Sequence, residues 1–217
     1  RPGNAKFKKL TPVDENSANP YTLTDDDRTV IGNTTPKFSG GFGLNATFKG
    51  FDVSAFFNFM YDFDVFNANK VMMTTWASNN YNNFSMDISA AKRWRNFDDM
   101  GNEIRYSPEI LAEFNKNATM WNPTSIGRPI AMSYAVEDGS FLRLNTATIG
   151  YTLPRAWTNK VGLSRVRFYA SGYNLFTITG YSGYDPEVDI ATGLTPNIDN
   201  NRYPRSRTYT FGVQLTF

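Results

Sequence analysis

The sequence predicts an all-β fold, an antiparallel segment of a transmembrane β-barrel whose long extracellular loops contain short helices. Three observations support this prediction. Residues 207–217 alternate strictly between apolar and polar side chains, which is typical of a strand with two different faces. The connections between the expected strands are alternately short and long, as in outer-membrane barrels. No run of about eighteen apolar residues is present, so the sequence excludes a transmembrane helix.

The first two strands are expected over residues 37–49 and 51–62. Both alternate between apolar and small or polar side chains, although Phe56 and Met60 interrupt the polar face of the second. The dipeptide Lys49-Gly50 between them is a tight-turn signal. We therefore expect a hairpin with a short turn.

Residues 63–140 show no sustained period of two. A short helix is expected from Pro108 to Lys116, because Ser107 can act as N-cap and proline favours the first helical position. A second helix is expected from Asp87 to Trp94. An excursion of this length is unusual in a compact soluble sheet, but it is ordinary for an extracellular loop of a barrel.

Three more strands are expected over residues 141–153, 165–177 and 207–217. The last strand has about ten residues with aromatics near both ends, which suits a bilayer crossing. Its apolar face consists of Tyr209, Phe211, Val213, Leu215 and Phe217. Bacterial outer-membrane barrels commonly end on an aromatic residue within such a pattern. We interpret this face, with Phe217, as the recognition signal for the barrel-assembly machinery.

The alternating connection lengths predict the orientation of the strands. If the last strand ends in the periplasm, Lys49-Gly50 and residues 154–164 are periplasmic turns, and the extracellular loops are 1–36, 63–140 and 178–206. No charged residue falls on the expected apolar faces, in keeping with a cost of about 2–4 kcal/mol for an arginine facing lipid at the midplane. A soluble antiparallel sandwich also alternates, but its five strands would leave two open aromatic edges.

Composition excludes several classes of function. The chain of 217 residues has 22 basic and 20 acidic side chains and a net charge of +2, with no charge block that favours a nucleic-acid partner. It contains neither cysteine nor histidine, which excludes disulfides, cysteine nucleophiles, histidine triads and zinc–imidazole sites. Its carboxylates lie in loops without a spacing that marks a catalytic pair. We expect no enzymatic activity, no cofactor and no metal site.

The first residues contain neither an initiator methionine nor a signal peptide. We therefore expect a fragment of a longer protein whose missing upstream part carries the export signal.

Four stretches together resemble the C-terminal part of SusC/RagA-type TonB-dependent outer-membrane transporters. They cover about half of the chain and occur in the order and spacing of that family. The stretches are DDRTVIGNTTPKFSGGFGLNATFKGFDVSAFFNFMYDFDVFN (Asp26–Asn67), VEDGSFLRLNTATIGYTLP (Val136–Pro154), RFYASGYNLFTITGYSGYDPEVD (Arg167–Asp189) and YPRSRTYTFGVQLTF (Tyr203–Phe217).

The resemblance implies a barrel of about 22 strands with an N-terminal plug. This chain would supply about the last five strands and none of the plug. The resemblance also implies a location in the outer membrane of a Gram-negative bacterium, in contact with its lipid, and active import of oligosaccharides or peptides. The TonB–ExbB–ExbD complex would drive import through the missing N-terminal part, and a SusD-like surface lipoprotein would cover the barrel. A passive porin-like channel and a secreted all-β binding module remain as alternatives.

Aromatic and acidic residues of the expected outer loops are candidates for contacts with a ligand or partner. They are Trp76, Tyr81, Trp94, Trp121, Tyr181, Tyr184, Asp185 and Glu187. Aromatic rings and carboxylates can stack on and hydrogen-bond to sugar rings. The alternative is structural: the aromatics pack the core of their own loop, Asp185 accepts backbone N–H groups, and Pro186 stiffens the turn.

Arginines on or beside the polar strand faces are expected to pair with carboxylates of adjacent strands. These arginines are Arg143, Arg165, Arg167, Arg205 and Arg207, and Glu137 and Asp138, which precede the strand at 141–153, are candidate partners.

Overall fold

A computed structural model describes residues 2–13, 15–16, 18–76, 83–126, 130–188 and 196–217. The chain divides into two compact units. One consists of Arg1–Ile31 and Asn67–Ala135, and the other of Gly32–Phe66 and Val136–Phe217. Within the described ranges, no helix has the length and apolar character needed to cross a membrane.

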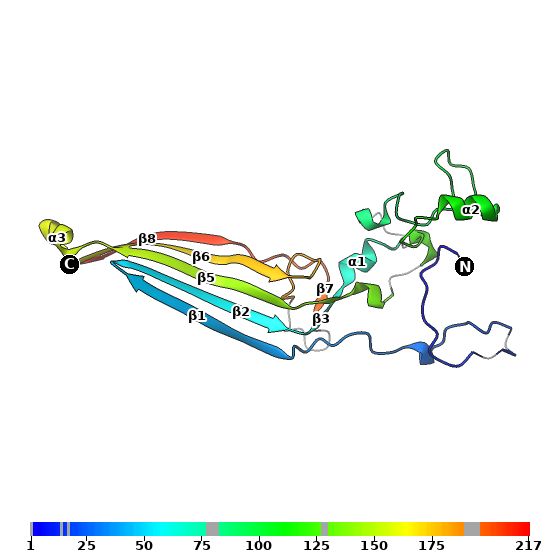
Figure 1. The fold of residues 1–217 in the computed structure, drawn as a ribbon, viewed down its shortest axis with the longest axis horizontal. Coiled ribbons are helices and arrows are strands. Elements are labelled where there is room, and N and C mark those ends of the chain that lie inside the picture. The colour runs from blue at the N-terminus through cyan, green and yellow to red at the C-terminus, as the bar shows by residue number, and fades with distance from the viewer. Residues whose placement is uncertain (1, 14, 17, 77–82, 127–129, 189–195) are drawn as a thin grey trace. The chain divides into compact units, whose positions relative to one another are not determined.

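The second unit is built on a five-stranded sheet whose neighbouring strands are all antiparallel (Figure 1). Each boundary lies within two residues of the expectation from the sequence. In spatial order the strands are β1 (Phe38–Phe48), β2 (Phe51–Tyr61), β5 (Phe141–Thr152), β6 (Arg165–Thr179) and β8 (Thr208–Thr216).

Both short connections lie at the same end of this sheet (Figure 1). Lys49 and Gly50 join β1 to β2 with φ values of 47° and 88°, and two consecutive positive φ values are typical of a type I′ hairpin turn. The connection from β5 to β6 contains α3 (Arg155–Thr158) and η5 (Asn159–Val161), which ends at Gly162 with φ 74°. Glycine adopts this left-handed conformation without steric cost.

The register gives the sheet one apolar and one polar face. Directly opposed residues share a face, as in the rows Leu44–Ala55–Ala147 and Asn45–Ser54–Thr148. The larger side chains of the apolar face are Phe38, Phe42, Leu44, Phe48, Phe51, Val53, Phe57, Phe59, Tyr61, Leu142, Leu144, Ile149, Tyr151, Val166, Phe168, Phe176, Ile178, Tyr209, Phe211, Val213 and Leu215.

A β-bulge keeps the apolar side chains of β5 on one face. Its register with β2 shifts because Asn145 lies between Leu144, which is opposite Phe57, and Thr146, which is opposite Phe56. An extra residue in one strand reverses the alternation beyond it. Apolar residues therefore occupy even positions before Asn145 and odd positions after it.

A smaller sheet continues from the loop end of the large one. It consists of β4 (Val136–Asp138), β3 (Asp64–Asn67) and β7 (Ile198–Asp199), in that order. The buried core of the unit lies here, where Met60 of β2 also packs. It contains Phe63, Val65, Phe141, Tyr181 and Val188.

The first unit contains short helices joined by irregular segments. They are η1 (Asp25–Asp27), α1 (Ala68–Met72), η2 (Met86–Ile88), α2 (Pro108–Phe114), η3 (Pro123–Ser125) and η4 (Ser133–Ala135). The expected helix after Ser107 is confirmed, although it ends at Phe114.

The expected helix from Asp87 to Trp94 is wrong. The structure has the short helix η2 there, followed by extended Ser89, with ψ 156°, and by a single turn in which the Arg93 N–H donates to the Ser89 carbonyl at 3.0 Å. The Trp94 N–H donates to the Met120 carbonyl at 2.8 Å, and Arg93 forms a parallel bridge with Met120. Because the Trp94 N–H bonds to a carbonyl of a distant segment, it cannot also bond to the carbonyl four residues before it, as a helix would require.

Asp27 organises the N-terminal segment of this unit. Its carboxylate accepts hydrogen bonds from the N–H groups of Leu10 and Thr11, both at 2.8 Å, and of Thr24, at 2.9 Å. Hydrogen bonds to the charged form of an acid favour that form. The N–H groups of Thr11 and Thr24 therefore hold the pKa of Asp27 well below its ordinary value.

Candidate functional site

The apolar face of the five-stranded sheet exposes many large side chains. Its side chains are large and uncharged, and they are most exposed on the two edge strands, where Phe48 is 70% and Phe211 is 80% exposed. Soluble monomers rarely expose an apolar patch of this extent. A band of uncharged, largely apolar side chains on one face is what a membrane-spanning sheet presents to lipid.

The polar face carries a charged pair near the hairpin end. Arg167 of β6 donates to Asp52 of β2, with 2.9 Å between Nε and Oδ1. The pair lies above Gly150 of β5, where an added Cβ would come within 2.4 Å of the guanidinium and 2.6 Å of the carboxylate. Glycine at this position of β5 lets one ion pair join β2 and β6 across it.

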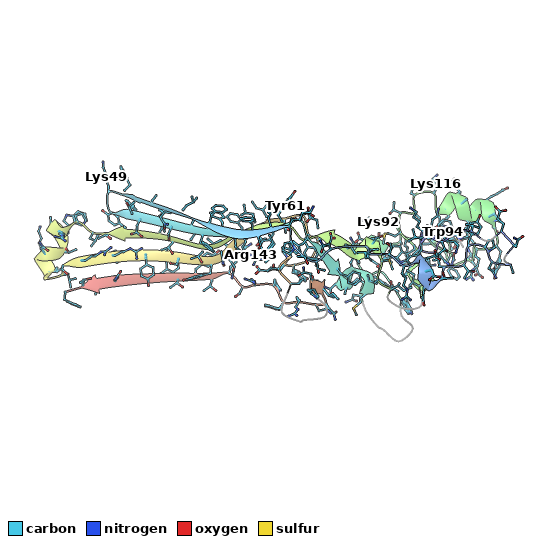
Figure 2. The ribbon with its side chains drawn as sticks, turned by 90° about the horizontal axis from the view of Figure 1, so that it is seen from below. Lys49, Tyr61, Lys92, Trp94, Lys116 and Arg143 are labelled. Carbon is cyan, nitrogen blue, oxygen red and sulfur yellow. The ribbon has the colours of Figure 1, made fainter. Side chains whose placement is uncertain are left out.

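A second charged cluster lies at the opposite end of the polar face. Figure 2 shows Arg143 towards the sheet end that carries Tyr61, away from Lys49. The Arg143 side chain is 2% exposed and pairs with Asp185 at 2.5 Å and with Glu187 at 3.6 Å. Arg205 completes the cluster by pairing with Glu187 at 2.7 Å. The cluster fixes the segment after β6 onto β5.

The cluster keeps Asp185 ionised. Burial alone would raise the pKa of this carboxyl, but the hydrogen bonds from Arg143 and from the Glu187 N–H, with the charges of Arg143 and Arg205, lower it below its ordinary value. Favourable hydrogen bonds and nearby positive charge therefore outweigh desolvation. The Glu187 N–H donates at 2.9 Å to the same oxygen, Asp185 Oδ1, that Arg143 contacts.

Tyr181 and Ser182 fix the start of the same segment. The Tyr181 hydroxyl donates to Asp199 Oδ2 at 2.7 Å, and the Ser182 N–H and hydroxyl donate to Glu137 at 2.9 and 2.8 Å. Burial, together with the Asp199 hydrogen bond and the nearby negative charges, raises the pKa of Tyr181. The Tyr181 side chain is 6% exposed, so the structure places it in the core.

The remaining candidates of this segment lie differently. Tyr184 is 85% exposed, whereas Asp185 and Glu187 are partly buried in the charged cluster. Of the arginines expected to pair with carboxylates, Arg143 pairs with Asp185 and Glu187 rather than with Glu137 or Asp138. Glu137 bonds to Ser182, and Asp138 accepts from the Ser140 N–H and hydroxyl at the tight connection into β5. Asp138 thus bonds within its own turn, whereas Glu137 bonds to a residue 45 positions away.

The candidate tryptophans all belong to the first unit. The Trp121 ring packs edge-on against Tyr134, with 4.9 Å between centroids, and its Nε1 donates to the Thr74 carbonyl at 3.1 Å. Trp94 packs against Gly3, where an added Cβ would lie 2.4 Å from the indole. Trp76 is 48% exposed and lies beside Phe84. Tyr81 lies outside the described residues.

Two features of the candidate site were missed from the sequence. The pairs Arg143–Asp185 and Arg167–Asp52 join residues 42 and 115 positions apart, and spacing gives no signal for either. The dipeptide Asp185-Pro186 does indicate an Asx turn, which holds the aspartate carboxylate in a fixed direction. Within the described ranges, no group of three or more acidic side chains could hold a metal ion.

Comparison with known proteins agrees with this architecture, although no protein-family model matches the chain. TonB-dependent receptor P3 of Formosa agariphila is 32% identical over 201 residues, which cover 90% of this chain and 18% of the receptor. TonB-dependent receptor SusC of Bacteroides thetaiotaomicron is 32% identical over 164 residues, covering 69% of this chain and 15% of SusC.

Solved structures of the RagAB peptide transporter are also similar. One has a TM-score of 0.69 and the closed-closed state of the importer has 0.67, both at 26% identity, covering 90% of this chain and 19% of the matched chain. The chain thus spans about a fifth of the length of the proteins that it matches. The five-stranded sheet with one apolar face, together with these similarities in sequence and structure, shows that the chain belongs to the SusC/RagA-type TonB-dependent receptors.

Proposed function

We propose that this chain forms part of the wall and outer loops of an active importer in the outer membrane of a Gram-negative bacterium. The five long strands contribute to the barrel, with the apolar face towards lipid and the polar face towards the lumen. As the C-terminal part of the barrel, the chain carries its assembly signal on the face that runs from Tyr209 to Phe217. The strand ends joined by the Lys49-Gly50 turn and by the connection that contains α3 lie in the periplasm.

The segregation of side chains between the two faces carries this proposal. On the apolar face no strand has a charged residue, whereas the polar face holds Asp52, Arg143 and Arg167. Burying one such charge in lipid costs about 2–4 kcal/mol at the midplane. A soluble sheet would also keep charges off a face covered by a second layer, but the apolar face of this sheet is exposed, with Phe48 at 70% and Phe211 at 80%.

The substrate is proposed to be an oligosaccharide or a peptide, and TonB–ExbB–ExbD is proposed to supply the energy. One of the similar solved structures, 26% identical to this chain, is described as the RagAB peptide importer. This similarity supports a peptide as the substrate. A SusD-like lipoprotein is the proposed lid. Within the chain, exposed Trp76 and Tyr184 remain the proposed contacts with substrate or lid, and no catalytic step is proposed.

Uptake by cells that carry the full-length parent protein tests this proposal. The probes are a fluorescent oligosaccharide mixture and a fluorescent peptide mixture, each offered to cells with and without a functional TonB complex. We expect uptake of one mixture, and its loss when TonB is removed. Uptake that persists without TonB would favour a passive channel and contradict active import.

A further inference from the structure

We infer that residues 181–188 form a fixed constriction at the mouth of the lumen and that Tyr184 contacts the substrate there. This inference rests on the proposed orientation of the sheet. It adds to the proposed function an inward-folded segment, the residues that fix it and one exposed aromatic side chain that contacts the substrate. We call residues 181–188 the inner segment.

The register shows which face the inner segment covers. Phe141 and Arg143 lie opposite Met60 and Asn58, on the face that also holds Ser54 and Asp52. Phe141 and Met60 pack with Tyr181 and Val188 in the buried core, and Arg143 pairs with Asp185. The chain therefore turns onto the polar face after β6. In a barrel, that face surrounds the lumen.

The inner segment is fixed at both ends and in the middle. Tyr181 bonds to Asp199 at its start, Asp185 pairs with Arg143 at its centre, and Val188 is 2% exposed at its end. Gly183 lies against the Tyr181 ring, where an added Cβ would come within 2.3 Å of a ring carbon. This close approach requires glycine and tightens the turn that carries Tyr184.

The fixed segment leaves one large side chain exposed. Tyr184 is 85% exposed, although Tyr181, Pro186 and Val188 around it are buried. An aromatic side chain at a rigid position offers a large contact area with little loss of conformational freedom. Its ring can stack on a sugar or on an apolar side chain of a peptide, so the contact serves either proposed class of substrate.

Chemical labelling tests the position of the inner segment without any need for transport. The chain has no cysteine, so a Tyr184→Cys variant of the full-length protein introduces a thiol of known location. Tyr203→Cys is the matched control, since Tyr203 is 91% exposed and lies in the same connection between β6 and β8. In intact cells, a small maleimide should label both variants. A long polyethylene glycol maleimide should label only Tyr203→Cys well. Equal labelling of both by the long reagent would overturn the inference.

Uptake tests the contact itself. For Tyr184→Ala we expect kcat/KM for uptake of the transported mixture to fall by about two- to tenfold, the range that one aromatic contact provides. The amount of assembled protein and uptake by Tyr203→Ala should stay unchanged. Unchanged uptake by Tyr184→Ala would overturn the inference. If uptake by the unsubstituted parent protein did not depend on TonB, that result would contradict active import. The labelling experiment would still test the position of the inner segment.

Discussion

Arg167 of β6 reaches Asp52 of β2 across the whole width of β5, and Gly150 provides the space for this contact. The Nε–Oδ1 distance is 2.9 Å, and Gly150 is directly opposite both Asp52 and Tyr169 in the register. The bond therefore links two strands that are not neighbours. It fixes their relative register on the polar face, where the backbone ladder alone links only adjacent strands.

Gly150→Ala should weaken this link. The added methyl group would come within 2.4 Å of the guanidinium and 2.6 Å of the carboxylate, so at least one of the two side chains must shift, and loss of their charged hydrogen bonds would cost up to about 1–3 kcal/mol. The measurement is the unfolding temperature of the full-length barrel, followed by gel mobility of unboiled samples. Gly43→Ala is the control, since the nearest atom to its Cβ would be 3.8 Å away. Equal effects of both substitutions would contradict the role of Gly150. In a protein that already carries Asp52→Asn, the ion pair is absent, so Gly150→Ala should lower the unfolding temperature by less than it does in wild type.

Arg143→Met should release the inner segment. The change leaves Asp185 and Glu187 partly buried without their shared cation, and breaking a buried ion pair costs about 3–5 kcal/mol. We expect a protease added to intact cells to cut between residues 181 and 205 faster in this variant. Arg205→Met removes the more exposed partner of Glu187 and should have a smaller effect. The same cutting rate in wild type and Arg143→Met would count against the cluster as an anchor.

The contribution of Asp185 should depend on pH in a defined direction. Its pKa is lower in the folded protein than its ordinary value of 3.8. A lowered acid pKa adds stability that is complete above the unfolded value and is lost as pH falls through the folded value. Unfolding temperatures of wild type and Asp185→Asn should therefore differ most above the ordinary pKa value of 3.8 and converge progressively as the pH falls below it. A difference that stays constant down to the lowest pH would refute this.

Deletion of Phe217 should lower assembly into the outer membrane. The proposed reason is that the barrel-assembly machinery reads the alternating face from Tyr209 to Phe217, on which Phe217 is 90% exposed. The measurement is the ratio of heat-modifiable to unfolded full-length protein in membrane fractions. Thr216→Ala, on the polar face, is the control. Normal insertion of the truncated protein would argue against the signal.

The strands could be predicted because their alternation is a local property. In residues 207–217 and 51–62 the alternation indicates which side chains share the apolar face, and β8 and β2 follow those patterns. The bulge at Asn145 could not be predicted in this way. Alternation reverses there, and only the pairing of Leu144 with Phe57 shows that the apolar face is continuous.

The contacts of the loops could not be predicted because their partners are distant. Arg143 bonds to a residue 42 positions away, and Glu137 accepts from Ser182, 45 positions away, whereas Asp138 bonds to nearby Ser140. The stretch from Asp87 to Trp94 has side chains that a helix accepts. Its backbone nevertheless pairs with Met120, because tertiary contacts override weak local preference. The family resemblance indicated the barrel, but it did not indicate that the segment after β6 turns onto the polar face.

The most direct test places nitroxide spin labels along β8 of the full-length protein in lipid vesicles. Single cysteines replace Tyr209, Thr210, Phe211, Gly212, Val213, Gln214 and Leu215 in turn. Collision rates with oxygen, which concentrates in lipid, and with a water-soluble nickel complex are then measured. We predict that oxygen access peaks at Tyr209, Phe211, Val213 and Leu215 and is low at the positions between them. Low oxygen access at Phe211 and Val213, or the absence of any alternation, would contradict a lipid-facing sheet.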